Sequence, residues 1–148
     1  MNVRYFDNAA TTRVKDEVLE EMLPYLKEKF GNPSSMYTIG REAKKAIENA
    51  RERVAKLINC KANEIYFTGS GSESDNTAIK GIAHKRAFKG KHIITSKIEH
   101  PAVLHTCQSL EREGFKVTYL NVNKDGIVDI NQLINSIRND TILISIMY

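Results

Sequence analysis

The chain is most constrained by the regular alternation of short apolar runs with helical patterns in its second half. Four runs are apolar and rich in β-branched or aromatic residues, at positions 64–68, 91–96, 115–122 and 141–147. Helical spacing separates them; one helical segment begins at Pro101 and another covers residues 129–138. Strands that alternate with helices in this way predict βαβ units, right-handed crossovers and a mostly parallel sheet. We therefore expect an α/β fold with helices on both faces of the sheet.

The first part of the chain is different, because helical patterns dominate it. Apolar spacing over residues 14–26 predicts a helix in which Pro24 implies a kink or a break into two shorter helices. A longer amphipathic helix is predicted at residues 38–59, while residues 3–6 have extended character. The expected parts are an N-terminal helical segment, residues 1–60, and the first part of an α/β domain, residues 61–148.

Composition and charge narrow the possible functions. With 148 residues, 41% hydrophobic and 27% charged, the chain has an ordinary globular composition. Its 22 basic and 18 acidic residues are interspersed and leave a net charge of +4, so we expect no nucleic-acid partner. The sequence has no signal peptide and no apolar run near the ~20 residues that cross a bilayer, so we expect a cytoplasmic protein with no membrane partner. Cys60 and Cys107 are isolated, which predicts free thiols and no metal site.

The turn at residues 68–76, Thr-Gly-Ser-Gly-Ser-Glu-Ser-Asp-Asn, joins a predicted strand to a predicted helix. The free N–H groups and positive dipole end of a helix start bind anions, and glycine lets a ligand come close. The turn is therefore a candidate phosphate site, although it is neither a Walker A loop nor a Gly-x-Gly-x-x-Gly motif. Ser70 with Glu73 and Ser72 with Asp75 also fit capping boxes, which need no ligand. Both interpretations are open.

His100 directly precedes Pro101. Proline is favoured at the first position of a helix, so His100 is predicted at or near the N-cap. It follows a strand, and ligands of parallel sheets bind beyond the carboxyl ends of the strands. There an imidazole can stack on a planar ligand or relay a proton, or it can be purely structural. The presence of the residue 68–76 turn on the same rim favours a functional role.

The last run, residues 141–148, is an apolar strand with no loop or helix after it. A sheet that is buried on both faces normally has its last strand covered. We therefore expect the chain to be an incomplete part of a larger protein.

Five short motifs resemble, in order, those of one enzyme family. They are Arg-Tyr-Phe-Asp-Asn-Ala-Ala-Thr-Thr at 4–12, Phe-Gly-Asn-Pro-Ser-Ser at 30–35, Phe-Thr-Gly-Ser-Gly-Ser-Glu-Ser-Asp-Asn at 67–76, Ile-Glu-His-Pro-Ala-Val-Leu at 98–104 and Ser-Ile-Met at 145–147. On these motifs the whole chain resembles the N-terminal part of a cysteine desulfurase of the NifS-like class, whose members are pyridoxal-phosphate enzymes with the type I aminotransferase fold. Asn-Pro-Ser-Ser favours the branch that serves iron–sulfur cluster assembly.

The resemblance implies roles for three residues. Gly71 and Ser72 would bind the phosphate of pyridoxal 5'-phosphate, and His100 would stack on the pyridine ring and assist proton transfer. Residues 61–148 would then begin the cofactor-binding domain, and no metal is implied. The cofactor-binding lysine, the aspartate and asparagine beside the ring and the sulfur-accepting cysteine lie further along in the family and have no counterpart in these 148 residues.

The reaction that the resemblance implies converts L-cysteine to L-alanine and leaves persulfide sulfur for iron–sulfur cluster or thio-cofactor synthesis. The expected partners of the complete enzyme are a second copy in a homodimer and a sulfur acceptor or iron–sulfur scaffold protein. We expect the 148 residues alone to be inactive. Two alternatives are open: a selenocysteine lyase or other enzyme of the class V aminotransferase fold, and an inert fragment that binds a partner through its exposed sheet.

Overall fold

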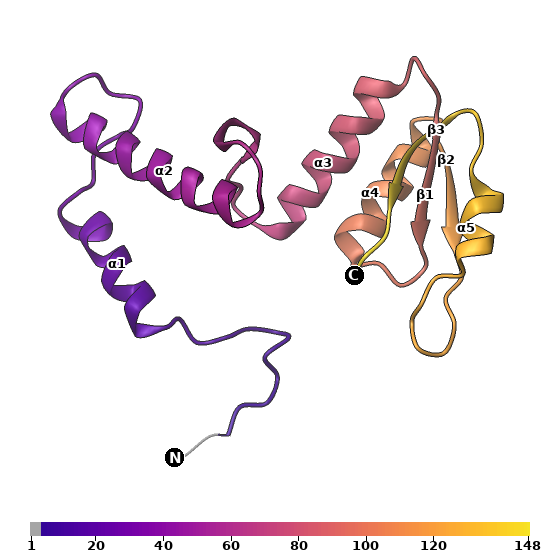
Figure 1. Ribbon diagram of the computed structural model, residues 1–148, viewed down its shortest axis with the longest axis horizontal. Helices are drawn as coiled ribbons and strands as arrows, with labels where there is room; N and C mark the ends of the chain where they lie inside the picture. Colours follow the sequence, from indigo (N-terminus) through magenta and orange to yellow (C-terminus); the bar gives the residue numbers. More distant parts are fainter. Residues whose placement is uncertain (1–3) are drawn as a thin grey trace. The chain divides into compact units, whose positions relative to one another are not determined.

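The computed structural model describes residues 4–148, which divide into two compact units between Tyr66 and Phe67. Figure 1 shows their helices and strands in chain order. The extended run predicted at residues 3–6 lies partly outside the described residues, and residues 4–6 have no regular structure. The proposed division into domains of residues 1–60 and 61–148 stays a prediction.

The first unit consists of α1 (Asp16–Lys27), α2 (Thr38–Leu57) and a short 3-10 helix, η1 (Ala62–Glu64). The expected break at Pro24 is absent from α1, because the helix runs through this residue and the Glu28 N–H donates to the Pro24 carbonyl at 2.9 Å. Nothing in α1 is buried, and α2 buries only small residues, Gly40, Ala43 and Ala55. The amphipathic pattern thus predicted both helices, but the described part of this unit has a thin apolar core.

The prediction of a strand at residues 64–68 is wrong. The chain forms η1 instead, closed by a hydrogen bond of 2.8 Å from the Lys61 N–H to the Glu64 carboxylate, and continues as a segment without strand pairing. Ile65 does have an extended backbone, with φ −96° and ψ 129°, and its carbonyl accepts from the Arg51 guanidinium. Tyr66 remains 81% exposed. β-branched and aromatic residues therefore favoured the extended backbone, while no neighbouring strand among the described residues pairs with it.

The second unit has strands and helices in alternation. Its elements are α3 (Gly71–Arg86), β1 (His92–Ser96), α4 (Pro101–Arg112), β2 (Lys116–Leu120), α5 (Ile130–Ser136) and β3 (Thr141–Ser145). The three strands form a parallel sheet in the order β2-β1-β3. This confirms the predicted α/β class and the parallel sheet.

The central strand β1 organises this unit, because all five of its residues are buried. The connection through α4 runs from β1 to the neighbouring strand β2, and the connection through α5 runs back from β2 past β1 to β3. Right-handed crossovers in these two opposite directions place α4 and α5 on opposite faces of the sheet. One face packs on α3 and α4, and the buried cluster there is Ile79, Ala83, Ile93, Val103, Cys107, Leu110 and Phe115. Burial of one large apolar side chain contributes about 1.5–3 kcal/mol, so this cluster holds α3 and α4 on the sheet.

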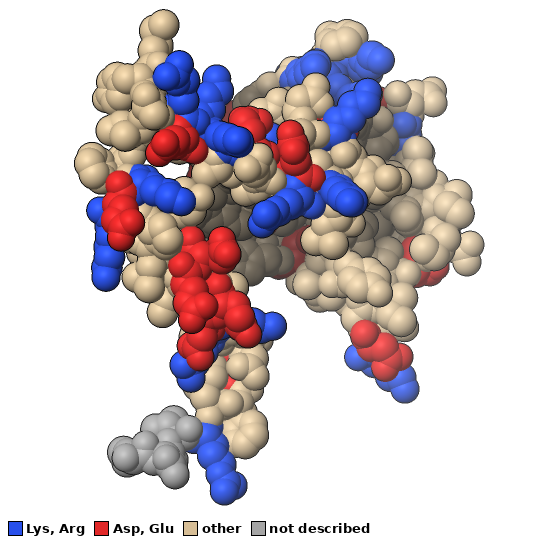
Figure 2. Space-filling model, turned by 60° about the vertical axis from the view of Figure 1, so that its left-hand side comes forward, with Lys and Arg blue, Asp and Glu red and all other residues tan. Residues whose placement is uncertain are grey.

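Charged side chains of both signs lie on the surface. Figure 2 shows basic side chains in several separate groups on the face that it presents, and a number of acidic side chains gathered in one patch.

His92 links all three strands. Its Nδ1 lies 2.7 Å from the Thr141 hydroxyl of β3 and its Nε2 lies 2.8 Å from the Thr118 hydroxyl of β2. The side chain is fully buried. Burial, and after it the Arg138 guanidinium, lower the pKa of His92 from its usual value. The neutral imidazole is therefore the form that the folded sheet accommodates.

The stability of the chain should depend on pH through His92. Because the folded-state pKa is lowered, the unfolded chain takes up a proton near pH 6.5 before the folded chain does, so the contribution of His92 is complete above that pH and is lost as the pH falls. In urea denaturation between about pH 7.5 and 5.5, the unmodified chain should lose more unfolding free energy than His92→Gln, which does not titrate. The carboxylates are common to both proteins and cancel in the comparison. Equal pH dependence of the two proteins would contradict this assignment.

Candidate functional site

The start of α3 is capped by its own side chains. The Ser70 hydroxyl accepts from the Glu73 N–H at 3.2 Å, and the Glu73 carboxylate accepts from the Gly69 N–H at 2.7 Å. The Thr68 hydroxyl donates to the Ser70 carbonyl at 3.0 Å and lies 2.6 Å from the Ser74 hydroxyl. The capping pair predicted from Ser70 and Glu73 is therefore present, with Gly69 as the backbone donor. The N-cap is Ser70, and no capping bond of the Ser72–Asp75 pair is found among the described residues.

The cap leaves the first two N–H groups of α3 available. Among the hydrogen bonds of the described residues, none uses the N–H of Gly71 or Ser72 or the Ser72 hydroxyl as a donor. These groups stand at the positive end of a 16-residue helix. A Cβ built on Gly71 meets no atom within 4 Å, so a ligand has open access. Capping and anion binding are therefore compatible here and do not compete for the same donors.

His100 caps the next helix, α4. The Ala102 N–H donates to His100 Nδ1 at 3.1 Å, and Pro101 occupies the first helical position, as predicted. Since Nδ1 accepts this bond, the proton of the neutral imidazole lies on Nε2. The structural interpretation of His100 is therefore confirmed, because Nδ1 caps the helix. The cap leaves the ring and Nε2 available, and the functional interpretation stays a prediction.

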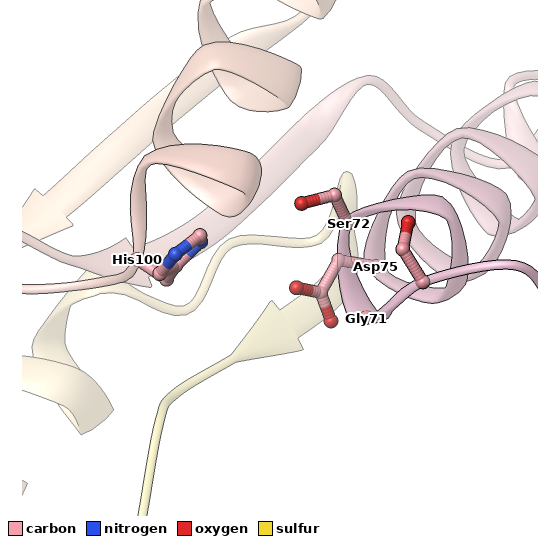
Figure 3. A pocket seen from close by; sticks show the side chains of 5 residues that line it. Gly71, Ser72, Asp75 and His100 are labelled. Carbon is pink, nitrogen blue, oxygen red and sulfur yellow. The ribbon is translucent and has the colours of Figure 1, made fainter. Parts of the chain in front are cut away.

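These two helix starts line one pocket of the second unit. Its walls come from Ser70, Gly71, Ser72, Asp75 and His100, and its volume is about 390 Å³. Figure 3 shows the Ser72 hydroxyl and the Asp75 carboxylate projecting from α3 towards the side on which His100 lies. The three residues singled out in the sequence, Gly71, Ser72 and His100, are thus brought together. Their binding roles stay predictions.

From the sequence, Asp75 was considered only as a capping partner of Ser72 and not as a site residue. It is half-buried and lies three residues after Ser72, a spacing that puts both side chains on one side of a helix and could have revealed it. The N–H groups at the start of α3 can bind an anionic group of a ligand. The Asp75 carboxylate, one turn further along the helix, can accept a hydrogen bond from a donor elsewhere on the same ligand.

Neither cysteine is among the residues that line this pocket. Cys107 lies on α4 and is fully buried in the core. Burial and, to a smaller extent, the Glu111 carboxylate raise the pKa of its thiol to about 11, so the thiolate is scarce at neutral pH. Cys60 belongs to the first unit and its thiol donates to the Lys61 carbonyl at 3.6 Å. Within residues 4–148, no three His, Cys, Asp or Glu side chains form a metal-binding group, and no helix is long and apolar enough to cross a membrane.

A protein-family comparison matches residues 4–148 to the model described as aminotransferase class-V. The chain belongs to this family. This class V chain is 61% identical to the cysteine desulfurase IscS of Methanosarcina thermophila and 58% identical to that of Clostridium botulinum (strain Hall). Each match covers 97% of this chain but only 36% of the relative. The chain therefore spans little more than a third of the length of these curated relatives.

Solved structures agree with this assignment. A NifS-like protein superposes on the class V chain with a TM-score of 0.93 at 46% identity, covering 97% of this chain and 39% of the other. A structure described as SspA in complex with cysteine gives a TM-score of 0.92 at 45% identity, with 97% and 42% coverage. The resemblance to the NifS-like cysteine desulfurases that the sequence motifs suggested is thus confirmed.

A pair of substitutions should separate the two roles of His100. Asparagine is a good N-cap residue and alanine is not, so His100→Ala should lower the free energy of unfolding by about 0.5–2 kcal/mol, while His100→Asn should stay close to the unmodified chain. Urea denaturation measures both values. If His100→Asn loses as much stability as His100→Ala, the stabilising contact of His100 is not the cap at Ala102.

Proposed function

We propose that this chain is the part of a pyridoxal-phosphate-dependent cysteine desulfurase that holds the cofactor phosphate and one face of its ring. The proposal rests on one observation: the start of α3, with its free N–H groups, and the side chain of His100 line the same pocket. Its identity of 58–61% to cysteine desulfurases over 97% of its length supports the same assignment.

The donors at the start of α3 fit a phosphate group. The N–H groups of Gly71 and Ser72 and the Ser72 hydroxyl supply three hydrogen bonds, and the helix dipole contributes about 0.3–2 kcal/mol for an anion at this position. The Asp75 carboxylate also lines the pocket, one turn further along α3, and repels an anionic group that lies beside it. We infer that it keeps the phosphate at the first turn of α3.

His100 fits the aromatic part of the cofactor. The hydrogen bond from Ala102 to Nδ1 fixes the orientation of the imidazole, which leaves a face for stacking on a planar ring. Nε2 carries the proton that the side chain can exchange with a bound molecule. When bound, pyridoxal phosphate supplies an electron sink for the substrate carbanion.

We further propose that the substrate of the complete enzyme is L-cysteine, which it converts to L-alanine while the sulfur passes to a protein thiolate. The SspA structure, 45% identical to this chain, is described as a complex with cysteine. Neither Cys60 nor Cys107 lines the pocket. The sulfur-accepting thiol is therefore assigned to the part of the relatives that this chain does not span. We propose that the complete enzyme is a homodimer that passes sulfur to an acceptor or iron–sulfur scaffold protein in the cytoplasm.

A chimera tests this function. We would replace the matching segment of the Methanosarcina thermophila enzyme by this chain, load it with pyridoxal phosphate and measure alanine released from L-cysteine. The chimera should be active, and Ser72→Ala should raise the dissociation constant of the cofactor about tenfold or more, because a hydrogen bond to a charged group is lost. Thr77→Ala, an exposed change on the same helix, is the matched control and should have no effect.

The outcomes of this experiment distinguish the alternatives. A folded chimera that releases no alanine from L-cysteine would contradict the proposal. Turnover of L-selenocysteine without turnover of L-cysteine would favour a selenocysteine lyase.

A further inference from the structure

Glu99 is a buried carboxylate that connects two separate segments at the rim of the sheet. Its side chain is 6% exposed. The Glu99 Oε1 atom accepts from the Ser96 hydroxyl at 2.8 Å and from the Met147 N–H at 2.7 Å. Ser96 is the last residue of β1, whereas Met147 follows the end of β3. One oxygen atom therefore holds together two segments that lie 48 residues apart.

These bonds lie where the sheet ladder stops. The pairing of β1 with β3 ends at Thr95 and Ser145, and both strands point towards the same rim because they are parallel. On the other side, the Lys97 N–H donates to the Leu120 carbonyl of β2 at 3.0 Å. The short turn between β1 and α4 is thus attached to both neighbouring strands, to β2 by its backbone and to β3 by the Glu99 side chain.

The choice of residue requires an explanation. Burial of a carboxylate costs free energy unless good hydrogen bonds compensate it, and an apolar side chain would fill the same space at lower cost. A carboxylate oxygen, in contrast, accepts two charge-assisted hydrogen bonds from different directions, which fixes both donors in position. The next residue is His100, whose ring lines the candidate cofactor pocket.

We propose that Glu99 is a positioning residue for this site: it holds the turn between β1 and α4 against the segment after β3 and so fixes the His100 ring at the pocket. The site role rests on the proposed function, whereas the link between Glu99 and the His100 cap can be measured without any ligand. Three substitutions address it. Glu99→Ala removes the acceptor, Glu99→Gln keeps an oxygen that can accept both bonds, and Ser96→Ala removes one donor with little change in volume.

The first measurement is amide hydrogen exchange of the 148-residue chain by NMR. In Glu99→Ala, the amides of Met147 and Ala102 should both exchange about tenfold faster or more, because the first loses its acceptor and the second loses a fixed His100 Nδ1. Glu99→Gln should exchange like the unmodified chain. If the Met147 amide is faster and the Ala102 amide is unchanged, Glu99 does not position His100 and the proposal is wrong. Should Glu99→Ala not fold, Ser96→Ala must accelerate both amides to a smaller extent, and unchanged Ala102 exchange there overturns the proposal equally.

The second measurement compares two ligands. Inorganic phosphate needs only the start of α3, whereas pyridoxal phosphate also needs the His100 ring. Glu99→Ala should therefore bind phosphate as the unmodified chain does and pyridoxal phosphate about tenfold more weakly, with recovery in Glu99→Gln. Equal affinity of Glu99→Ala and the unmodified chain for pyridoxal phosphate overturns the site role of Glu99. If the unmodified chain binds neither ligand, the proposed function is wrong, and so is the site role of Glu99. The link between Glu99 and the His100 cap is then decided by the hydrogen-exchange data, which need no ligand.

Discussion

The parallel pairing of β1 with a strand on each side is the interaction on which the second unit depends. The buried strand β1 is hydrogen-bonded to β2 on one side and to β3 on the other, so any displacement of β1 would break both sets of hydrogen bonds. The sheet face on which α3 and α4 pack is therefore fixed. Their N-terminal ends meet at the carboxyl rim of the sheet, where loops are free to carry polar groups. The position of the pocket is therefore a consequence of the sheet order, and its chemistry comes from the two helix starts.

The helices α3 and α4 are capped at their N-terminal ends by different kinds of side chain. A helix begins with N–H groups that have no partner within the helix, and side chains normally satisfy some of them. In α3 the cap uses Ser70 and Glu73 and leaves the first two N–H groups for a ligand, while in α4 the cap is the imidazole of His100. A residue that caps a helix has a fixed orientation at little cost in entropy, and such a ring suits the stacking role proposed for His100. Helix capping and the proposed binding role are therefore compatible in the same few residues.

Much of this arrangement can be predicted from the sequence, because it follows from local patterns. Alternating apolar runs predicted the parallel sheet, Pro101 predicted the N-cap position of His100, and Ser70 with Glu73 predicted the cap of α3. One error was local, because α1 continues through Pro24 where a break was expected. Another error and one omission concern outcomes that depend on distant parts of the chain. Residues 64–68 have the composition of a strand, but pairing needs a neighbour that composition does not provide. The bond between Glu99 and Met147 likewise joins residues 48 apart, and no local spacing reveals it.

The central claim is that the start of α3 and His100 form one site for a phosphorylated aromatic cofactor. The most direct measurement is a titration of the ¹⁵N-labelled chain with pyridoxal phosphate, followed by NMR, with pyridoxal, which lacks the phosphate, as the control. We predict saturable shifts of the Gly71, Ser72 and Ala102 amides with pyridoxal phosphate, and shifts of the Ala102 amide alone, at higher concentration, with pyridoxal. Saturable binding that leaves the Gly71 and Ser72 amides unchanged, or no binding at all, would contradict this account.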